Sequence, residues 1–204
     1  LVEEAAIRRT LLLAERTGSP LYILHMGAAS GVVALAESRA RGLPVYGETL
    51  AAYLSFTSDK LWDDANRGLL WNNYPTIKSQ SDQDELWVAL ADGRLQTVGS
   101  DHFLVGANDR YERMGTSVDQ LQCGQAAVEL RLPVAYHLGV HEGRIGLERF
   151  VEVVSTNPAK LMGLYPRKGT IAVGSDADIV LFDPRQTWTV HWEDLRMTAD
   201  YSCW

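Results

Sequence analysis

Apolar and polar positions follow two different periods along the first hundred residues. Some stretches place apolar side chains three and four positions apart between charges, which is the helical period. Others are short apolar runs bounded by Gly or Pro, which are typical of buried strands. The two kinds alternate, as in a parallel sheet with covering helices, so an α/β fold is predicted. The expected helices cover 1–17, 31–41 and 81–91, the last capped by Ser81, and the expected strands cover 21–25, 44–48 and 95–101.

The second half of the chain has a different pattern. Residues 102–122 are polar and too long for a plain connection, which is typical of a functional or mobile segment. Helices are predicted over 124–140, 147–154 and 158–164. After Gly169 the chain alternates short β-rich runs with turn residues, which predicts an antiparallel β unit appended to the α/β part. Its expected strands cover 170–173, 177–182 and 187–190.

Two predicted strands end in side chains that can bind a metal. The run Leu21-Tyr22-Ile23-Leu24 leads directly into His25, and the strand ending at Val98 is followed by Gly99, Ser100 and Asp101. Because the carboxyl ends of parallel strands meet at one edge of a sheet or barrel, where α/β enzymes keep their chemistry, the two side chains are expected near each other. An imidazole and a carboxylate are both common ligands of catalytic metals. The sequence therefore indicates a shared metal site.

Composition narrows the function classes. The 204 residues are 46% hydrophobic and 22% charged, as in an ordinary globular protein, and the net charge of −7 without a basic block argues against a nucleic-acid or anionic-membrane partner. No apolar run is long enough for a membrane span. Cys123 and Cys203 are interpreted as thiols of a reducing cytoplasm, with a single disulfide left open. The chain starts at Leu1 inside a predicted helix, so we expect a piece of a longer polypeptide.

Several longer phrases together carry a family resemblance. The chain strongly resembles the C-terminal half of hydantoinases and dihydropyrimidinases, which are cyclic amidohydrolases, over nearly all 204 residues. The longest phrase is the most specific. The phrases are Leu21 to His25, Gly42-Leu43-Pro44-Val45-Tyr46-Gly47-Glu48-Thr49, Gln96 to His102, Val154-Ser155-Thr156-Asn157-Pro158-Ala159-Lys160, and the run from Leu164 to Asp178 that contains Tyr165-Pro166-Arg167-Lys168-Gly169.

The resemblance implies a fold and a metal centre. The expected fold is the C-terminal part of a metal-dependent (β/α)8 barrel over 1–168, followed by part of a small β-sandwich over 169–204. The family resembled here holds two divalent ions, usually zinc, bridged by a carbamylated lysine. His25 matches one of its metal-binding histidines, and Asp101 matches the aspartate that is both a metal ligand and the proton-transfer group. The lysine and the other histidines have no counterpart here and are expected upstream of Leu1.

The resemblance also implies a substrate pocket that differs from the common family pattern. Tyr74 stands where the family often has a serine, and Cys123, before Gly124, stands where it often has an asparagine. These positions are expected to hold the amide ring of the substrate through backbone groups, which survive a change of side chain. Tyr74 and Cys123 would change the volume and polarity of the pocket. His102 is interpreted either as a residue that supports the metal ligands or as polar packing, and His137, His141 and His191 are interpreted as structural or solvent-facing. Glu48 and Thr49 face the same strand ends, with a plain hydrogen-bonding role equally open.

The expected function is therefore hydrolytic opening of a cyclic ureide or imide, such as a hydantoin or dihydropyrimidine, to an N-carbamoyl amino acid. The 204 residues alone are expected to be inactive, because two ligands cannot hold a dinuclear site. Two alternatives stay open: a non-enzymatic adaptor on the same scaffold, like the collapsin response mediator proteins, and a related allantoinase or dihydroorotase. The resemblance implies a cytoplasmic homotetramer with a small-molecule substrate and without a nucleic-acid or membrane partner.

Overall fold

The computed structural model describes residues 1–62 and 67–204, and its centre is a small parallel sheet. The strands β1 (Leu21–Ile23), β2 (Val45–Leu50) and β3 (Thr97–Gly99) lie in the order β1-β2-β3. Leu21 pairs with Val45 on one side of β2, and Glu48 pairs with Thr97 on the other. All three strands are parallel and therefore end at the same edge of the sheet, as the alternation of elements predicted.

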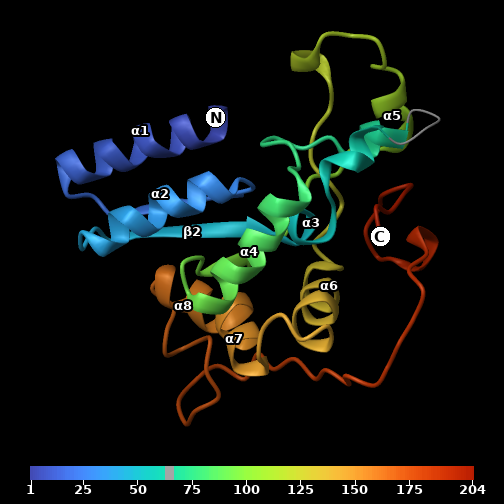
Figure 1. The fold of residues 1–204 in the computed structure, drawn as a ribbon. Coiled ribbons are helices and arrows are strands. Elements are labelled where there is room, and N and C mark those ends of the chain that lie inside the picture. The colour runs from blue at the N-terminus through green and yellow to red at the C-terminus, as the bar shows by residue number, and fades with distance from the viewer. Residues whose placement is uncertain (63–66) are drawn as a thin grey trace.

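Helices lie before, between and after the strands. Figure 1 shows α1 and α2 running alongside each other next to β2, with α4 crossing below them. The α-helices are α1 (Val2–Thr17), α2 (Ala29–Ala40), α3 (Ala51–Ser55), α4 (Gln80–Asp92), α5 (Ala107–Tyr111), α6 (Arg131–Tyr136), α7 (Leu147–Val151) and α8 (Asn157–Leu161). The 3₁₀ turns are η1 (Ser58–Trp62), η2 (Arg67–Trp71), η3 (Val118–Gln120) and η6 (Trp192–Asp194), and the π-helical turns are η4 (His137–His141) and η5 (Glu152–Thr156).

Local sequence chemistry explains where the long helices begin and end. Gly18 ends α1 in the left-handed conformation, with φ of 68°, and Gly93 does the same for α4. The cap of α4 is Ser79, whose side chain accepts a hydrogen bond from the backbone N–H of Asp82, so the prediction of Ser81 as the cap was wrong. The expected helix over 124–140 is also shorter, because it begins only at Arg131. Pro133 then lies in its first turn, where a missing N–H costs nothing.

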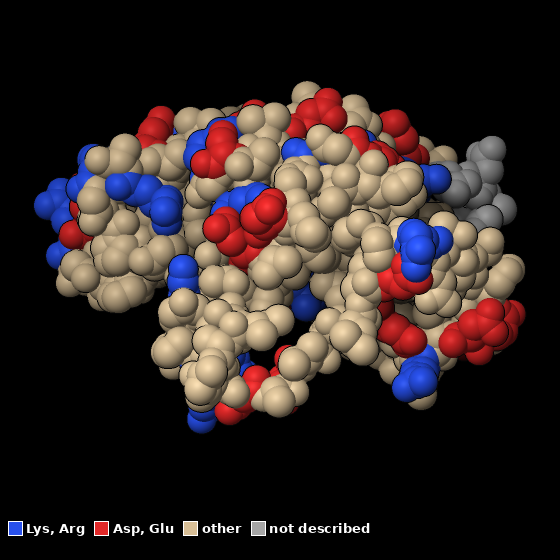
Figure 2. Space-filling view, turned by 90° about the horizontal axis from the view of Figure 1, so that it is seen from below, with Lys and Arg blue, Asp and Glu red and all other residues tan. Residues whose placement is uncertain are grey.

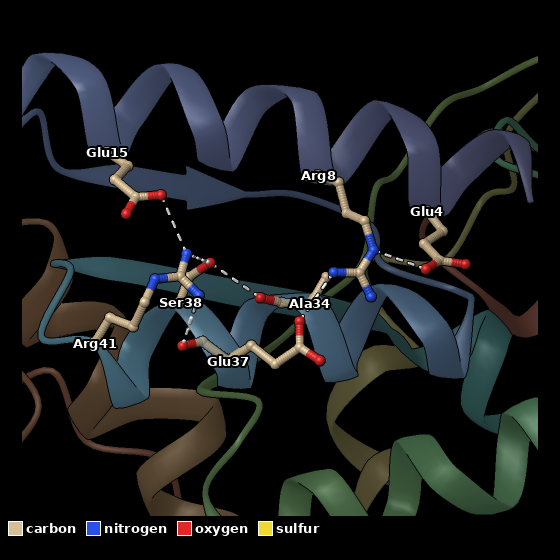
Figure 3. Close-up of polar contacts among 7 residues, drawn as sticks. All are labelled: Glu4, Arg8, Glu15, Ala34, Glu37, Ser38 and Arg41. Carbon is tan, nitrogen blue, oxygen red and sulfur yellow. Dashed lines mark hydrogen bonds and ion pairs between the residues drawn. The ribbon is translucent and has the colours of Figure 1, made fainter.

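The interface between α1 and α2 combines an apolar core with ion pairs at its rim. Ile7, Leu11 and Ala14 of α1 are buried in the core that also contains Val32 and Leu35 of α2. At the surface Arg8 bridges Glu4 and Glu37, and Arg41 of the α2 end pairs with Glu15 (Figure 3). Exposed pairs of this kind contribute little to stability, so apolar packing holds α1 on α2.

The region from 169 to 204 differs from the expected β unit. In the described part of the chain it contains no strand, and the apolar side chains of the expected strands face solvent: Ile171 is 87% exposed, Val173 108% and Leu181 94%. A strand needs a partner to satisfy its backbone groups, and none of the described residues pairs with this segment. Its last residues fold back onto the α/β part, where the ring of Trp204 lies 5.1 Å from that of Phe56. The division of the chain at 168 stays a prediction.

Surface charge is mixed in sign. On the face in Figure 2, blue and red side chains lie interspersed over a largely tan surface, without a field of one sign. Among the described residues, no helix has both the length and the apolar character that a membrane crossing requires.

Candidate functional site

The two predicted metal ligands share an unusual backbone conformation. His25 has φ of 42° and Asp101 has φ of 45°, and they are the only non-glycine residues with positive φ in the described parts of the chain. Such a conformation costs about 1–3 kcal/mol and persists only where the surroundings hold it, which occurs most often at functional sites. His25 is half-buried beyond the end of β1, and Asp101 is exposed beyond the end of β3. The structure thus places both at the same edge of the sheet, as predicted.

The turn after His25 is held by hydrogen bonds from three directions. The N–H of Met26 donates to the carbonyl oxygen of Glu48 (2.7 Å), and the hydroxyl of Thr49 donates to the carbonyl of Met26 (2.9 Å). Two carboxylates from other helices accept hydrogen bonds from backbone N–H groups just before α2 and at its first residue. Those of Gly27 and Ala28 donate to Glu3, and that of Ala29 donates to Asp82. Because Ala28 has no side chain that can cap α2, these carboxylates do so and fix the turn.

Glu48 is a half-buried carboxylate on β2, the strand that lies between the two that lead to the predicted ligands. The hydroxyl of Tyr22 donates to it (2.8 Å) and lies 2.6 Å from the hydroxyl of Thr97, which joins all three strands. Burial raises the pKa of Glu48, and the charge of Asp101 raises it further, while Tyr22 and His25 lower it. A Cβ atom built on Gly99 would lie 2.6 Å from Cδ of Glu48, so only glycine fits beside this carboxylate. Glu48 thus fills the space at the strand ends and interacts with both candidate ligands.

The residues present fit a divalent metal in kind but not in number. Imidazole and carboxylate are donors that zinc and similar cations accept. In the described residues no group of three or more His, Cys, Asp or Glu side chains is arranged to hold an ion. His25 and Asp101 therefore supply part of a metal centre, and further donors are needed to complete one.

The predicted substrate residues lie on two segments that the fold joins. The N–H of Gly124 donates to the carbonyl of Asn72 (3.0 Å), and the side chain of Asn72 donates to the carbonyl of Gln122 (2.9 Å). The hydroxyl of Tyr74 also reaches across to donate to the carbonyl of Val118. Tyr74 and the Cys123–Gly124 pair, almost fifty residues apart in sequence, thus belong to one structural unit.

Backbone groups remain available on both segments. Within the described part of the chain, neither the N–H nor the C=O group of Tyr74 or of Cys123 has a hydrogen-bond partner. Gly124 is held at φ of 93°, and a Cβ there would lie 2.6 Å from Cβ of Phe103, so glycine is required at this turn. Two peptide groups on tied segments suit recognition of a cyclic amide, which carries one N–H and one C=O side by side.

The structure brings some of the predicted site residues to one cavity and leaves others apart. His25 and Tyr74 line an apolar groove of about 740 Å³ along β1, together with Leu21 and Ile23. Asp101, Cys123 and Gly124 do not line it. His102, beside Asp101, accepts the backbone N–H groups of Ala127 and Val128 through Nδ1, so this nitrogen takes part in polar packing, one of the two roles expected for it.

Sequence reasoning missed three residues that organise this region. Tyr22 lies inside a predicted strand, but no pattern indicated that its hydroxyl reaches Glu48. Asn72 and Arg110 both bind the carbonyl of Gln122. Arg110 lies in the segment 102–122 that the sequence indicated as functional or mobile, but no pattern singled out this arginine or Asn72. The burial of Arg110 becomes visible only in three dimensions.

A match to a family model shows which protein family the chain belongs to. Residues 21–201 match the model of the amidohydrolase family, which is most of the chain. The chain belongs to the amidohydrolase family. The resemblance to hydantoinases inferred from the sequence is confirmed by the relatives of this amidohydrolase chain. It is 40% identical over 201 residues to a D-hydantoinase of Rhizobium radiobacter, in a match that covers 98% of this chain and 44% of the relative.

Solved structures agree with that relationship. The chain superimposes on a dihydropyrimidinase from Brevibacillus agri with a TM-score of 0.94 and 39% identity, over 98% of this chain and 43% of that one. A D-hydantoinase from a Bacillus species gives a TM-score of 0.94 with 40% identity, over 98% of this chain and 44% of that one. This amidohydrolase chain thus spans less than half the length of the proteins that it matches.

Proposed function

We propose that this chain is part of a metal-dependent cyclic amidohydrolase of the hydantoinase and dihydropyrimidinase type. The observation that carries the proposal is the pair of strained residues, His25 and Asp101, held beyond the ends of the two outer strands, β1 and β3, of one sheet. The similarity to D-hydantoinases over 98% of the chain supports it. The reaction opens a cyclic ureide, such as a hydantoin or a dihydropyrimidine, to an N-carbamoyl amino acid.

The proposed cofactor is a pair of divalent ions, of which zinc fits the donor types best. His25 would bind through a ring nitrogen and Asp101 through its carboxylate, with the remaining ligands, including a carbamylated lysine, supplied by residues outside this chain. Bound divalent ions supply a water molecule of lowered pKa and polarise the carbonyl that it attacks.

Asp101 is the proposed proton-transfer group. Its carboxylate takes a proton from the water as the oxygen forms a bond to the ring carbonyl carbon. It then gives that proton to the ring nitrogen as the carbon–nitrogen bond breaks, so the carboxylate is regenerated. Its exposure beyond β3 leaves it open to substrate, and its left-handed backbone fixes its direction.

The ring amide of the substrate is held, in this proposal, by the peptide groups of Tyr74, Cys123 and Gly124. The hydrogen bonds between Asn72 and the 122–124 segment support this, because they keep the two segments at a fixed separation. The tyrosine and cysteine side chains would shape the rest of the pocket and so favour ring substituents different from those of relatives with smaller residues there.

Site-directed variants test the proposal in the protein at its full natural length. Asp101→Asn and His25→Ala should each lower kcat for ring opening by roughly 10²-fold or more, because proton transfer and metal binding are lost. Asp109→Asn and His137→Ala are the matched controls. Each makes the same kind of substitution at an exposed residue outside the proposed site, and each variant should keep the parent rate. Release of the N-carbamoyl product by chromatography is the measurement. A parent rate in both site variants would refute the proposal.

The substrate panel separates this proposal from its alternatives. Hydantoin, dihydrouracil, allantoin and dihydroorotate are assayed in parallel, and turnover of the last two alone would assign the related activities. A metal-replete protein inactive on all four would favour the adaptor.

We also propose a cytoplasmic homotetramer on the basis of the family resemblance, and a monomeric mass in sedimentation experiments would contradict the tetramer.

A further inference from the structure

Arg110 is a buried cation for which the described part of the chain provides no anionic partner. It lies on α5, is 1% exposed, and forms no ion pair with any residue that the structure describes. Its guanidinium instead donates to three backbone carbonyls, those of Leu69 (3.1 Å), Gln122 (3.2 Å) and Gly124, and its Cζ atom lies 5.6 Å from the centre of the Tyr201 ring. Burying a charge is costly unless it is fully bonded, so these carbonyls determine where the side chain lies.

Two of the three carbonyls flank the predicted substrate residue Cys123. We call residues 121–125 the substrate loop. Arg110 holds its carbonyls at Gln122 and Gly124, whereas Asn72 holds the same segment through the carbonyl of Gln122 and the N–H of Gly124. The loop is therefore fixed on both sides of Cys123, whose own N–H and C=O groups have no partner within the described residues.

The shape of the guanidinium suits this task. It is a rigid planar fork that directs several N–H groups at fixed angles, and hydrogen bonds from a cation to a neutral acceptor are stronger than those between neutral groups. A lysine at the same place would offer a flexible point charge, and an apolar side chain would leave the carbonyl of Gly124 without a donor, while that of Gln122 would keep only Asn72. Arg110 thus determines the direction of the peptide groups next to Cys123.

We propose that Arg110 is a positioning residue of the substrate pocket: by binding the carbonyls of Gln122 and Gly124, it presents the free peptide group of Cys123 to the amide of the ring substrate. This rests on the proposed function. Arg110 itself does not touch the substrate. Its loss weakens substrate binding and leaves the groups that transfer the proton in place.

Steady-state kinetics of the full-length protein separates positioning from general stability. Arg110→Met should raise KM for hydantoin or dihydrouracil roughly tenfold or more, with kcat within about threefold of the parent. The KM of Arg110→Lys should lie between those of the parent and Arg110→Met, because lysine keeps the positive charge but lacks the planar guanidinium. Arg113→Met is the matched control, since Arg113 is an exposed arginine three residues further along, and it should keep both constants. A parent KM in Arg110→Met, or a fall in kcat alone, would overturn the proposal.

Hydrogen exchange provides a readout that does not need activity. In Arg110→Met the amides of 121–126 should exchange at least tenfold faster than in Arg113→Met, while those of α1 and α2 stay as slow as in the parent. Unchanged exchange in the loop would overturn the positioning role, as would a uniform increase over the whole chain. If Arg110→Met does not fold, Arg110→Lys carries the same comparison. If the parent protein is inactive on every cyclic ureide, the proposed function is refuted. The exchange rates of the substrate-loop amides in the variants would still decide whether Arg110 holds this loop in place.

Discussion

At the scale of single residues, the site is marked by backbone strain more than by side-chain chemistry. His25 and Asp101 both adopt φ near 45°, a region that L-residues avoid because Cβ approaches the following carbonyl oxygen. Hydrogen bonds around Met26 and Thr49 hold the first turn in place. The sequence predicted which residues would face the sheet edge, but not that they would be strained, because nothing in a Leu-His or Ser-Asp pair requires positive φ.

The strain at Asp101 leads to a prediction in which stability and activity change in opposite directions. Asp101→Gly should raise the free energy of unfolding by about 1 kcal/mol, because glycine adopts positive φ without the Cβ contact. It should also abolish ring opening. Asp101→Ala removes the same carboxylate but keeps the Cβ atom, so it should be inactive without that gain. Urea unfolding of the three proteins measures the difference, and equal stability of the Gly and Ala variants would contradict it.

At the scale of elements, the sequence predicted the core of the fold well and its ends less well. Helical and strand periods located α1, α2, α4 and the three strands within a few residues, since burial imposes these periods directly. The N-terminal cap of a helix depends on a single side-chain hydrogen bond, and Ser79 and Ser81 could each provide it from the sequence alone. The sequence favoured Ser81, whereas Ser79 caps α4. The helix expected from 124 begins only at 131 because Gln125 pairs with His102, a contact that no local pattern encodes.

The two serines allow a direct test of the cap. Ser79→Ala should lower the free energy of unfolding by about 1 kcal/mol, because the N–H of Asp82 loses its acceptor at the helix start. Ser81→Ala removes an equally exposed hydroxyl inside the first turn and should change stability by less than about half of that. Thermal or urea unfolding under identical conditions measures both. A larger loss in Ser81→Ala would assign the cap to that residue instead.

At the scale of the whole molecule, the sequence could predict the family but not the contacts that depend on distant partners. Long phrases such as Gln96 to His102 carry the family resemblance, so the family could be inferred from sequence and was confirmed. The antiparallel β unit expected after 169 is not present among the described residues. The apolar pattern of its short runs indicates that each strand needs a partner strand, but it does not indicate where that partner lies. Ile171, Val173 and Leu181 face solvent for that reason. The positions of Asn72 and Arg110 also depend on long-range packing.

The same reasoning predicts how the 204 residues behave alone. Two donors beyond the ends of β1 and β3, without a third within reach among the described residues, should bind zinc weakly and not as a pair of ions. Dialysed against equimolar zinc, the isolated chain should retain less than one ion per molecule by elemental analysis, and should not open hydantoin or dihydrouracil. His25→Ala should lower even that content, whereas His137→Ala, which removes an exposed histidine far from the strand ends, should not. Two retained ions with ring-opening activity would mean that this chain completes the metal centre by itself, and that the proposed donors outside it are unnecessary.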